Sequence, residues 1–149
     1  MSEKNYDPRM HTAEHILNQT MVRLFGCPRS RNSHIERKKS KCDYQIAAEP
    51  TVTQIEEIER QVNSIIFSNL DVKEDSIPKS EAGKYLDLTK LPADAPDTLR
   101  VINVGDYDAC ACIGPHVNNT AEIGVFKIIS HSYEQGTLRL RFKLVDKES

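Results

Sequence analysis

The sequence predicts an α+β fold in which helices pack on one side of an antiparallel or mixed sheet. Two segments with the periodicity of amphipathic helices lie in the first half of the chain, and most segments with strand periodicity follow in the second half. No internal repeat interrupts this order. With 149 residues, of which 38% are hydrophobic, the chain can bury one core, so we expect residues 1–149 to form a single domain.

The first predicted helix covers residues 8–25. Asp7 is a suitable N-cap, and Pro8 fits the first helical position, where its missing N–H has no cost. His11 and His15 fall on the flank of an apolar stripe, so we expect them at the edge of the core. The stripe consists of Met10, Ala13, Leu17, Met21, Leu24 and Phe25.

The second predicted helix begins at the capping-box pattern Thr53-Gln54-Ile55-Glu56 and ends near Leu70. Its apolar residues recur at helical spacing, which predicts that one face covers a sheet. They are Ile55, Ile58, Val62, Ile65 and Ile66.

Strands are predicted where apolar and polar residues alternate, and the last segment shows this most clearly. In residues 137–145, leucines and Phe142 alternate with basic residues, which predicts one buried and one solvated face. The turn Glu134-Gln135-Gly136 joins this strand to the one before it. Further strands are predicted at 42–46, 72–77, 99–104, 107–112 and 125–131, and a short helix at 80–85.

Two short pairs of metal-type side chains lie near opposite ends of the chain. In His11-Thr12-Ala13-Glu14-His15 the two imidazoles are four residues apart, so on a helix they project from one face and can share a cation. In Cys112-Ile113-Gly114-Pro115-His116 the glycine and proline predict a tight loop whose ends point the same way. Three imidazoles and a thiolate suit Zn²⁺, so we predict one zinc site formed by the fold.

The cysteines leave a second kind of metal site open. Cys27, Cys42, Cys110 and Cys112 are enough for a Cys₄ zinc site, but they lack paired CxxC spacing. We expect Cys27 and Cys42 to be small core residues and Cys110 to pack beside the histidine site. The polar N-terminus carries no secretory pattern, so we expect reduced thiols, a cytoplasmic location and no membrane partner.

The charge of the chain does not by itself indicate a nucleic-acid partner. The net charge is −2 and the pI about 6.2, so phosphate binding would have to come from a local basic patch, and we expect no DNA partner. One patch lies in the loop before residue 42, and another on the solvated face of the last strand. Their predicted phosphate contacts are Arg37, Lys38 and Lys39, and Arg139 and Arg141. The alternative is that the patches are merely solvated surface.

Three segments in a fixed order resemble the second additional domain of threonyl- and alanyl-tRNA synthetases, an editing module that also occurs alone as the AlaX group. Residues 11–17 resemble the family's H-T-A-x-H-L-L helix, residues 112–124 its C-x-x-x-H loop and the stretch after it, and residues 58–63 a helical motif between them. The likeness covers nearly the whole chain and is closest to the small AlaX type. It implies the editing-domain fold.

In that family the HxxxH and CxxxH pairs hold the metal, which here implies His11, His15, Cys112 and His116. The implied reaction is hydrolysis of the ester that joins a wrong amino acid to the terminal ribose of tRNA. Such editing is needed because the pocket in which a synthetase binds its amino acid distinguishes small side chains by a free-energy difference of only about 1–3 kcal/mol. The implied substrate is Ser-tRNA(Ala) or Gly-tRNA(Ala), and we predict that the Thr12 hydroxyl contacts the serine hydroxyl.

Two departures from the family pattern keep alternatives open. The loop at 112–116 is closer to the threonyl branch and residues 120–124 to the alanyl branch, so Ser-tRNA(Thr) is an alternative substrate. Cys110 occupies a position that is acidic in the synthetases. Two other classes of function stay open: a zinc hydrolase of small esters and a non-catalytic tRNA-binding module. The oligomeric state is not predicted.

Overall fold

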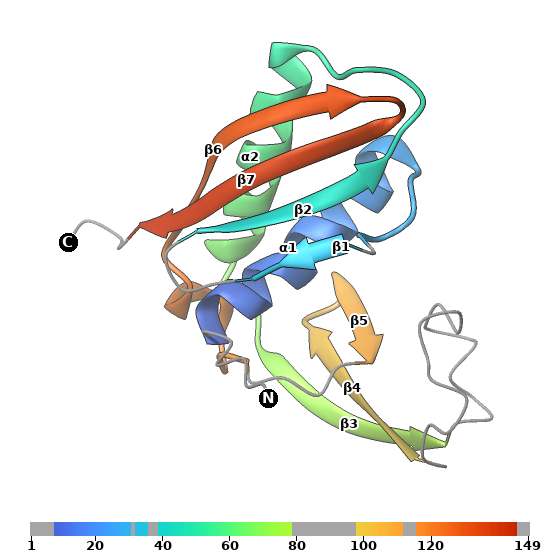
Figure 1. Ribbon diagram of the computed structural model, residues 1–149. Coiled ribbons are helices and arrows are strands. Elements are labelled where there is room, and N and C mark those ends of the chain that lie inside the picture. The colour runs from blue at the N-terminus through green and yellow to red at the C-terminus, as the bar shows by residue number, and fades with distance from the viewer. Residues whose placement is uncertain (1–7, 31, 36–38, 79–97, 112–115, 146–149) are drawn as a thin grey trace.

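Two helices and two antiparallel sheets make up the described part of the protein, in a computed structural model (Figure 1). The helices α1 (Pro8–Phe25) and α2 (Val52–Ile66) lie behind a four-stranded sheet in that view, and a three-stranded sheet lies below them. The predicted α+β class is confirmed. The described residues are 8–30, 32–35, 39–78, 98–111 and 116–145.

The strands divide between two sheets. The four-stranded sheet has the order β1 (Asn32–His34), β2 (Ser40–Gln45), β7 (Thr137–Val145) and β6 (Val125–Glu134). The three-stranded sheet has the order β3 (Val72–Pro78), β4 (Thr98–Val104) and β5 (Asp108–Ala111). A short 3₁₀ helix at Thr120–Glu122 precedes β6. The helix predicted at 80–85 lies outside the described residues.

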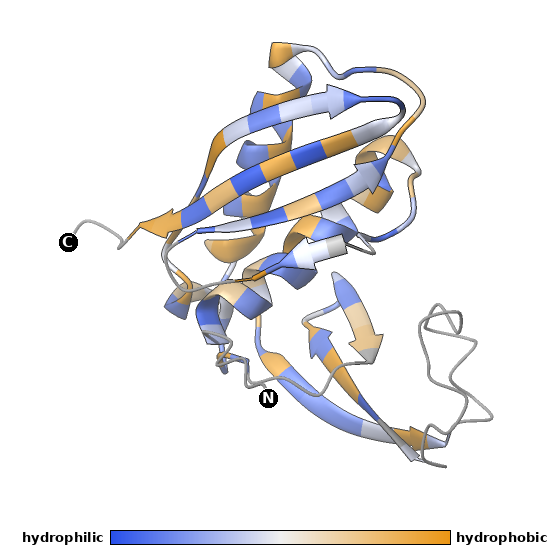
Figure 2. Cartoon of the chain, in the orientation of Figure 1, coloured by the Kyte–Doolittle hydropathy of each residue, from blue (hydrophilic) through white to orange (hydrophobic). Residues whose placement is uncertain are grey.

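The β6–β7 hairpin forms as predicted, and its inner face is the centre of the core. Gln135 and Gly136 both have positive φ values, 50° and 83°, which a tight hairpin turn requires. Leu138, Leu140 and Phe142 are 0% exposed, while the basic residues between them lie on the other face (Figure 2).

Helix α1 has the bounds that its sequence predicted. The apolar stripe is buried from Met10 to Met21, but Leu24 is 40% exposed, so the last turn is not fully covered and Leu24 was wrongly placed in the stripe. Gly26 follows with φ 66° and donates its N–H to the Val22 carbonyl, which ends the helix in a left-handed C-cap.

Helix α2 starts two residues earlier than predicted. The N-cap is Thr51, whose hydroxyl accepts from Gln54 N at 3.1 Å while the Gln54 side chain accepts from Thr51 N at 2.8 Å. The prediction placed the capping box at Thr53, which has Glu56 three positions later, as Thr51 has Gln54. Thr51 adopts the extended backbone that an N-cap needs. The helix ends at Ile66, four residues before the predicted end near Leu70, and Asn69 then takes a positive φ of 56°.

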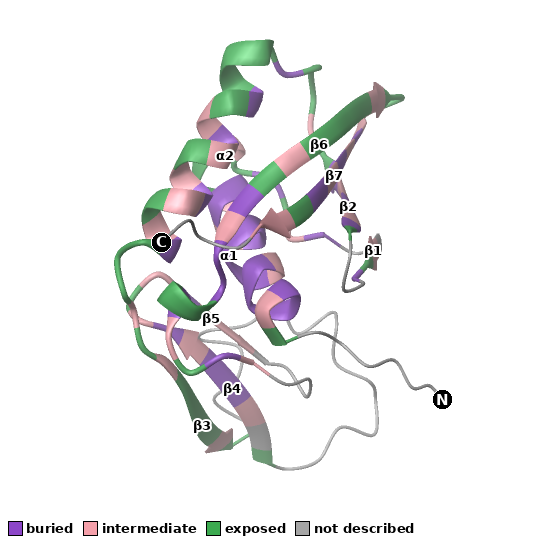
Figure 3. Ribbon diagram, turned by 90° about the vertical axis from the view of Figure 1, so that its left-hand side faces the viewer, coloured by how far each residue is buried: buried purple, intermediate pink, exposed green. Residues whose placement is uncertain are grey.

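Side chains of α2 also bind the outer edge of β6, which has no strand neighbour on that side among the described residues. The Asn63 amide accepts from Phe126 N at 2.8 Å and donates to Phe126 O at 2.9 Å. One turn earlier, a Glu59 carboxylate oxygen accepts from Ile128 N at 2.7 Å. Figure 3 shows the buried face of α2 turned toward the rest of the molecule. The helix is therefore joined to the sheet by both apolar packing and hydrogen bonds.

We expect Asn63→Ala to lower the free energy of unfolding by about 2 kcal/mol, because it leaves both backbone groups of Phe126 without a protein partner. Urea unfolding measures this loss. Gln61→Ala is the matched control on the same helix, since it removes only a bond to the Glu57 side chain and should change the value by less than about 0.5 kcal/mol. Equal losses in the two variants would contradict the prediction.

No helix in the described part of the chain combines the length and apolarity that crossing a bilayer requires.

Candidate active site

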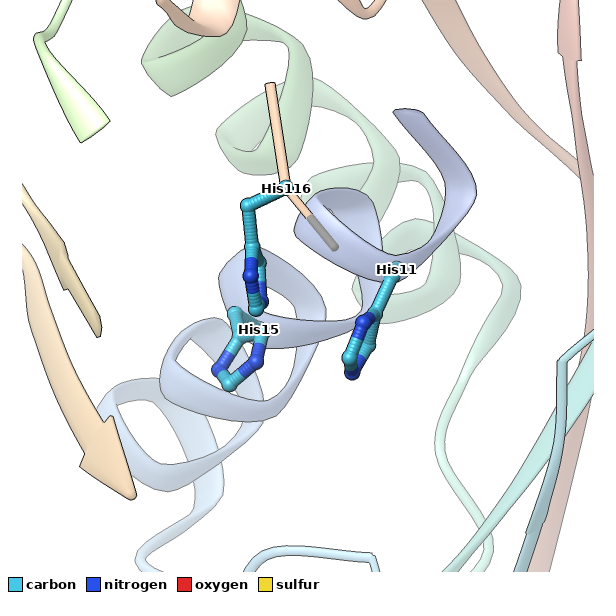
Figure 4. Close-up of side chains that lie close together, drawn as sticks. All are labelled: His11, His15 and His116. Carbon is cyan, nitrogen blue, oxygen red and sulfur yellow. The ribbon is translucent and has the colours of Figure 1, made fainter. Parts of the chain in front are cut away.

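Three histidines from two distant parts of the chain meet on one side of α1. His11, His15 and His116 form a group whose candidate ligand nitrogens all lie within 4.8 Å of one another. Their ring centroids are 4.4 to 5.2 Å apart, and His11 stacks on His116 (Figure 4). His11 and His15 are only 6% and 4% exposed. The fold thus brings together the three predicted imidazoles that lie within the described residues.

Thr12 joins the segment that begins at His116 to helix α1. Its hydroxyl donates to the Pro8 carbonyl at 2.8 Å and accepts from Val117 N at 3.2 Å, and the residue is 0% exposed. Because Val117 follows His116 directly, this bond holds the third imidazole against α1. The hydroxyl predicted to contact serine is therefore already engaged with two backbone groups, and one lone pair remains.

The donor set and its geometry fit a cation with nitrogen ligands. A tetrahedral zinc with bonds of about 2.1 Å holds its ligand nitrogens about 3.4 Å apart, so nitrogens that lie within 4.8 Å of one another need to approach by at most about 1.4 Å. Side-chain rotation on a fixed helix can supply that movement. Cys112, the predicted fourth ligand, lies outside the described residues.

A buried carboxylate that the sequence analysis missed lies beside this cluster. Asp108, at the start of β5, receives a bidentate ion pair from Arg29 at 2.7 and 3.2 Å and a hydrogen bond from the Gln19 amide at 3.0 Å. Its Oδ2 is 3.5 Å from Nδ1 of His15. Burial would raise the pKa of Asp108, but the contact with His15 and the charge of Arg29 outweigh it and hold that pKa below its usual value.

Only part of the arrangement around Asp108 could be predicted from the sequence. Gln19 continues the four-residue spacing of His11 and His15, so its place on the same ridge of α1 was predictable. Asp108 comes from a strand 79 positions beyond Arg29, and no local pattern joins them.

The cysteines of the described region do not form a metal site of their own. The histidine group is the cluster of metal-type ligands found among the described residues, and Cys27, Cys42 and Cys110 are not part of it. Cys27 and Cys42 are buried in the core, as predicted. Burial raises the pKa of Cys42 to about 12, which keeps it a thiol.

The predicted basic residues have different surroundings. Arg139 on β7 makes a bidentate ion pair with Asp43 on β2, at 2.8 and 2.9 Å. Lys39 and Arg141 instead line a hollow of about 230 Å³, whose other lining residues are His34, Ser40 and Lys41. Within the described ranges, no ion pair involves Lys39, Lys41 or Arg141. Arg37 and Lys38 lie outside the described residues.

Comparisons with known proteins agree with these observations. A family model described as the threonyl and alanyl tRNA synthetase second additional domain matches residues 99–140. The alanine--tRNA ligase of Bacillus subtilis (strain 168) is 36% identical over 123 residues, and that of Bacillus pumilus (strain SAFR-032) is 34% identical over 123 residues. Each match covers 82% of this chain and 14% of the ligase, so the chain corresponds to a small part of these relatives. Residues 99–140 therefore match the threonyl and alanyl tRNA synthetase second additional domain, and most of the chain is homologous to a region of alanine--tRNA ligase, as its motifs predicted.

Proposed function

We propose that this protein is an aminoacyl-tRNA deacylase that removes a wrongly attached amino acid from tRNA, with Ser-tRNA(Ala) as its main substrate and Gly-tRNA(Ala) as a second. Water adds to the ester carbonyl, and the bond to the ribose oxygen breaks, which releases the amino acid and a tRNA with a free terminal hydroxyl. The similarity to alanine--tRNA ligases supports the choice of the alanyl over the threonyl tRNA.

The convergence of His11, His15 and His116 is the observation that carries this proposal. We propose that these three imidazoles and the Cys112 thiolate hold Zn²⁺. When bound there, zinc supplies a positive charge that orients or polarises the aminoacyl ester. The protein supplies the fixed positions of the imidazoles, through the helical spacing of the first two and the Thr12 bond beside the third.

A direct test compares three substrates with and without a chelator. We expect deacylation of Ser-tRNA(Ala) and Gly-tRNA(Ala), little of Ser-tRNA(Thr), and loss of activity in the chelated protein. A preference for Ser-tRNA(Thr) would assign the protein to the threonyl tRNA instead. Binding of tRNA without deacylation would favour the non-catalytic module, and equal rates on free aminoacyl esters would favour a general ester hydrolase.

We further propose that the hollow between β1, β2 and β7 receives a phosphate of the tRNA acceptor stem. Lys39, Lys41 and Arg141 bring positive charge to one concave place where no described acid pairs with them. Arg37 and Lys38 belong to the same predicted basic loop. Arg139 is a weaker candidate, because Asp43 already holds its guanidinium in a bidentate pair.

We expect the double change Lys41→Ala and Arg141→Ala to weaken tRNA binding and to reduce the slope of log K against log salt by about 1 to 2. Arg139→Ala on the same strand is the matched control, and it should leave the slope nearly unchanged because its charge is paired with Asp43. Binding measured at several salt concentrations gives both slopes. If the control reduces the slope as much as the double change, the phosphate does not lie in the hollow.

A further inference from the structure

We infer that Asp108 is the positioning residue of His15: its carboxylate holds the proton of His15 on Nδ1 and thereby turns the lone pair of Nε2 toward the other two histidines. The effect of Asp108 on zinc binding rests on the proposed function, whereas its effect on which nitrogen of His15 carries the proton does not. A neutral imidazole has one protonated and one free nitrogen, and the partner of the first decides which nitrogen can bind a cation.

The geometry assigns the two nitrogens of His15 to different partners. Nδ1 is 3.5 Å from Oδ2 of Asp108, and Figure 4 shows one ring nitrogen of His15 on the side of His11 and the other on the opposite side. Since Nδ1 faces the carboxylate, Nε2 remains for the cluster. A distance of 3.5 Å is the outer limit of a hydrogen bond, and a shift of His15 by a few tenths of an ångström makes a good one.

The carboxylate is held too firmly to be an incidental neighbour. Arg29 donates to both of its oxygens and Gln19 donates to Oδ1, so two side chains, one on α1 and one in the segment just after it, fix one buried acid. The Asp108 side chain is 0% exposed, and those of its partners Arg29 and His15 are 15% and 6% exposed. A charge buried at that depth is stable only with partners, and here the partners also set its orientation.

Glu14, a second carboxylate beside the cluster, has no comparable support. Glu14 approaches Nε2 of His11 at 4.0 Å, beyond hydrogen-bond distance, and it lies one turn along the same helix. The described structure therefore gives one of the two α1 histidines a rigid carboxylate partner from another element. Carboxylate partners of this kind commonly raise metal affinity 10- to 100-fold by fixing the tautomer and ring orientation.

The first test uses the unmodified protein without metal. Nitrogen NMR of the imidazoles, at a pH where His15 is neutral, reports which ring nitrogen carries the proton. We expect the proton on Nδ1 of His15. A proton mainly on Nε2 would overturn the inference whether or not the protein binds zinc or deacylates tRNA.

The second test uses Asp108→Asn, which keeps the size of the side chain. Arg29 should keep its hydrogen bond to the oxygen of the new carboxamide, so that the NH₂ group faces Nδ1 of His15. Because the NH₂ group donates, it favours an unprotonated Nδ1 and a proton on Nε2. We expect that tautomer in the spectrum and a zinc dissociation constant raised about 10- to 100-fold, measured by competition with a chromophoric chelator. Asp106→Asn is the matched control, an exposed acid two residues earlier that should change neither value.

The outcomes separate this inference from the proposed function. If Asp108→Asn leaves both the tautomer and the zinc affinity unchanged, Asp108 only stabilises the fold. If the variant does not fold, the tautomer of the unmodified protein still decides. A protein that binds no zinc but carries the proton on Nδ1 would refute the metal part of the proposed function and leave the role of Asp108 standing.

Discussion

His116→Ala is expected to abolish stoichiometric zinc binding and to slow deacylation of Ser-tRNA(Ala) by about three orders of magnitude. His116 completes the group with His11 and His15, and without it the proposed site keeps only three of its four ligands, the two imidazoles on α1 and the Cys112 thiolate. The lost charge stabilisation of several kcal/mol corresponds to that rate factor. Elemental analysis should find about one zinc per chain in the unmodified protein and far less in the variant.

His131→Ala is the control for this prediction, because His131 is an exposed histidine on β6. It should bind zinc and deacylate tRNA like the unmodified protein. If His116→Ala retained full activity without zinc, the metal would have no part in the reaction and the editing function would need another catalytic group.

Thr12→Val is expected to slow deacylation about 100-fold, although the side chain keeps nearly the same shape. The change removes the acceptor for Val117 N and so releases the segment that carries His116. A shift of a reacting group by about 1 Å can cost that factor. The buried N–H left without its partner should also lower the free energy of unfolding by about 1–3 kcal/mol.

Thr12→Ser is the matched variant, since it keeps the hydroxyl that bonds to Pro8 and Val117. It should restore most of the rate and stability. The proposed contact with the substrate is read separately, from the ratio of Ser-tRNA(Ala) to Gly-tRNA(Ala) hydrolysis. If Thr12→Val slows both substrates equally, Thr12 positions His116 and does not select serine.

Local patterns predicted most of the helices and strands but not their finer boundaries. The alternation in β7 and the turn at Gln135-Gly136 are short-range signals, and both were confirmed. The start of α2 was misplaced because two threonines each precede a Gln or Glu at the capping distance, and only the backbone at Thr51 distinguishes them.

The candidate site, too, could be predicted only where residues close together in the sequence mark it. The four-residue spacing of His11 and His15 predicted their common side of α1, and the structure brings His116 to them. The pairing of Asp108 with Gln19, Arg29 and His15 could not be predicted, because Asp108 lies on β5 while these partners lie on α1 or just after it, and burial depends on the whole fold. Likewise, only the pairing of β2 with β7 shows that Asp43 neutralises Arg139.

The bonds from Glu59 and Asn63 to β6 have a consequence for self-association. An open strand edge ordinarily offers its amides and carbonyls as a template on which a second molecule can add a strand. Here the helix occupies Phe126 and Ile128 at one border of the four-stranded sheet, and β1 at the other border is only three residues long. Copies of this protein are therefore expected to resist edge-to-edge aggregation through this sheet.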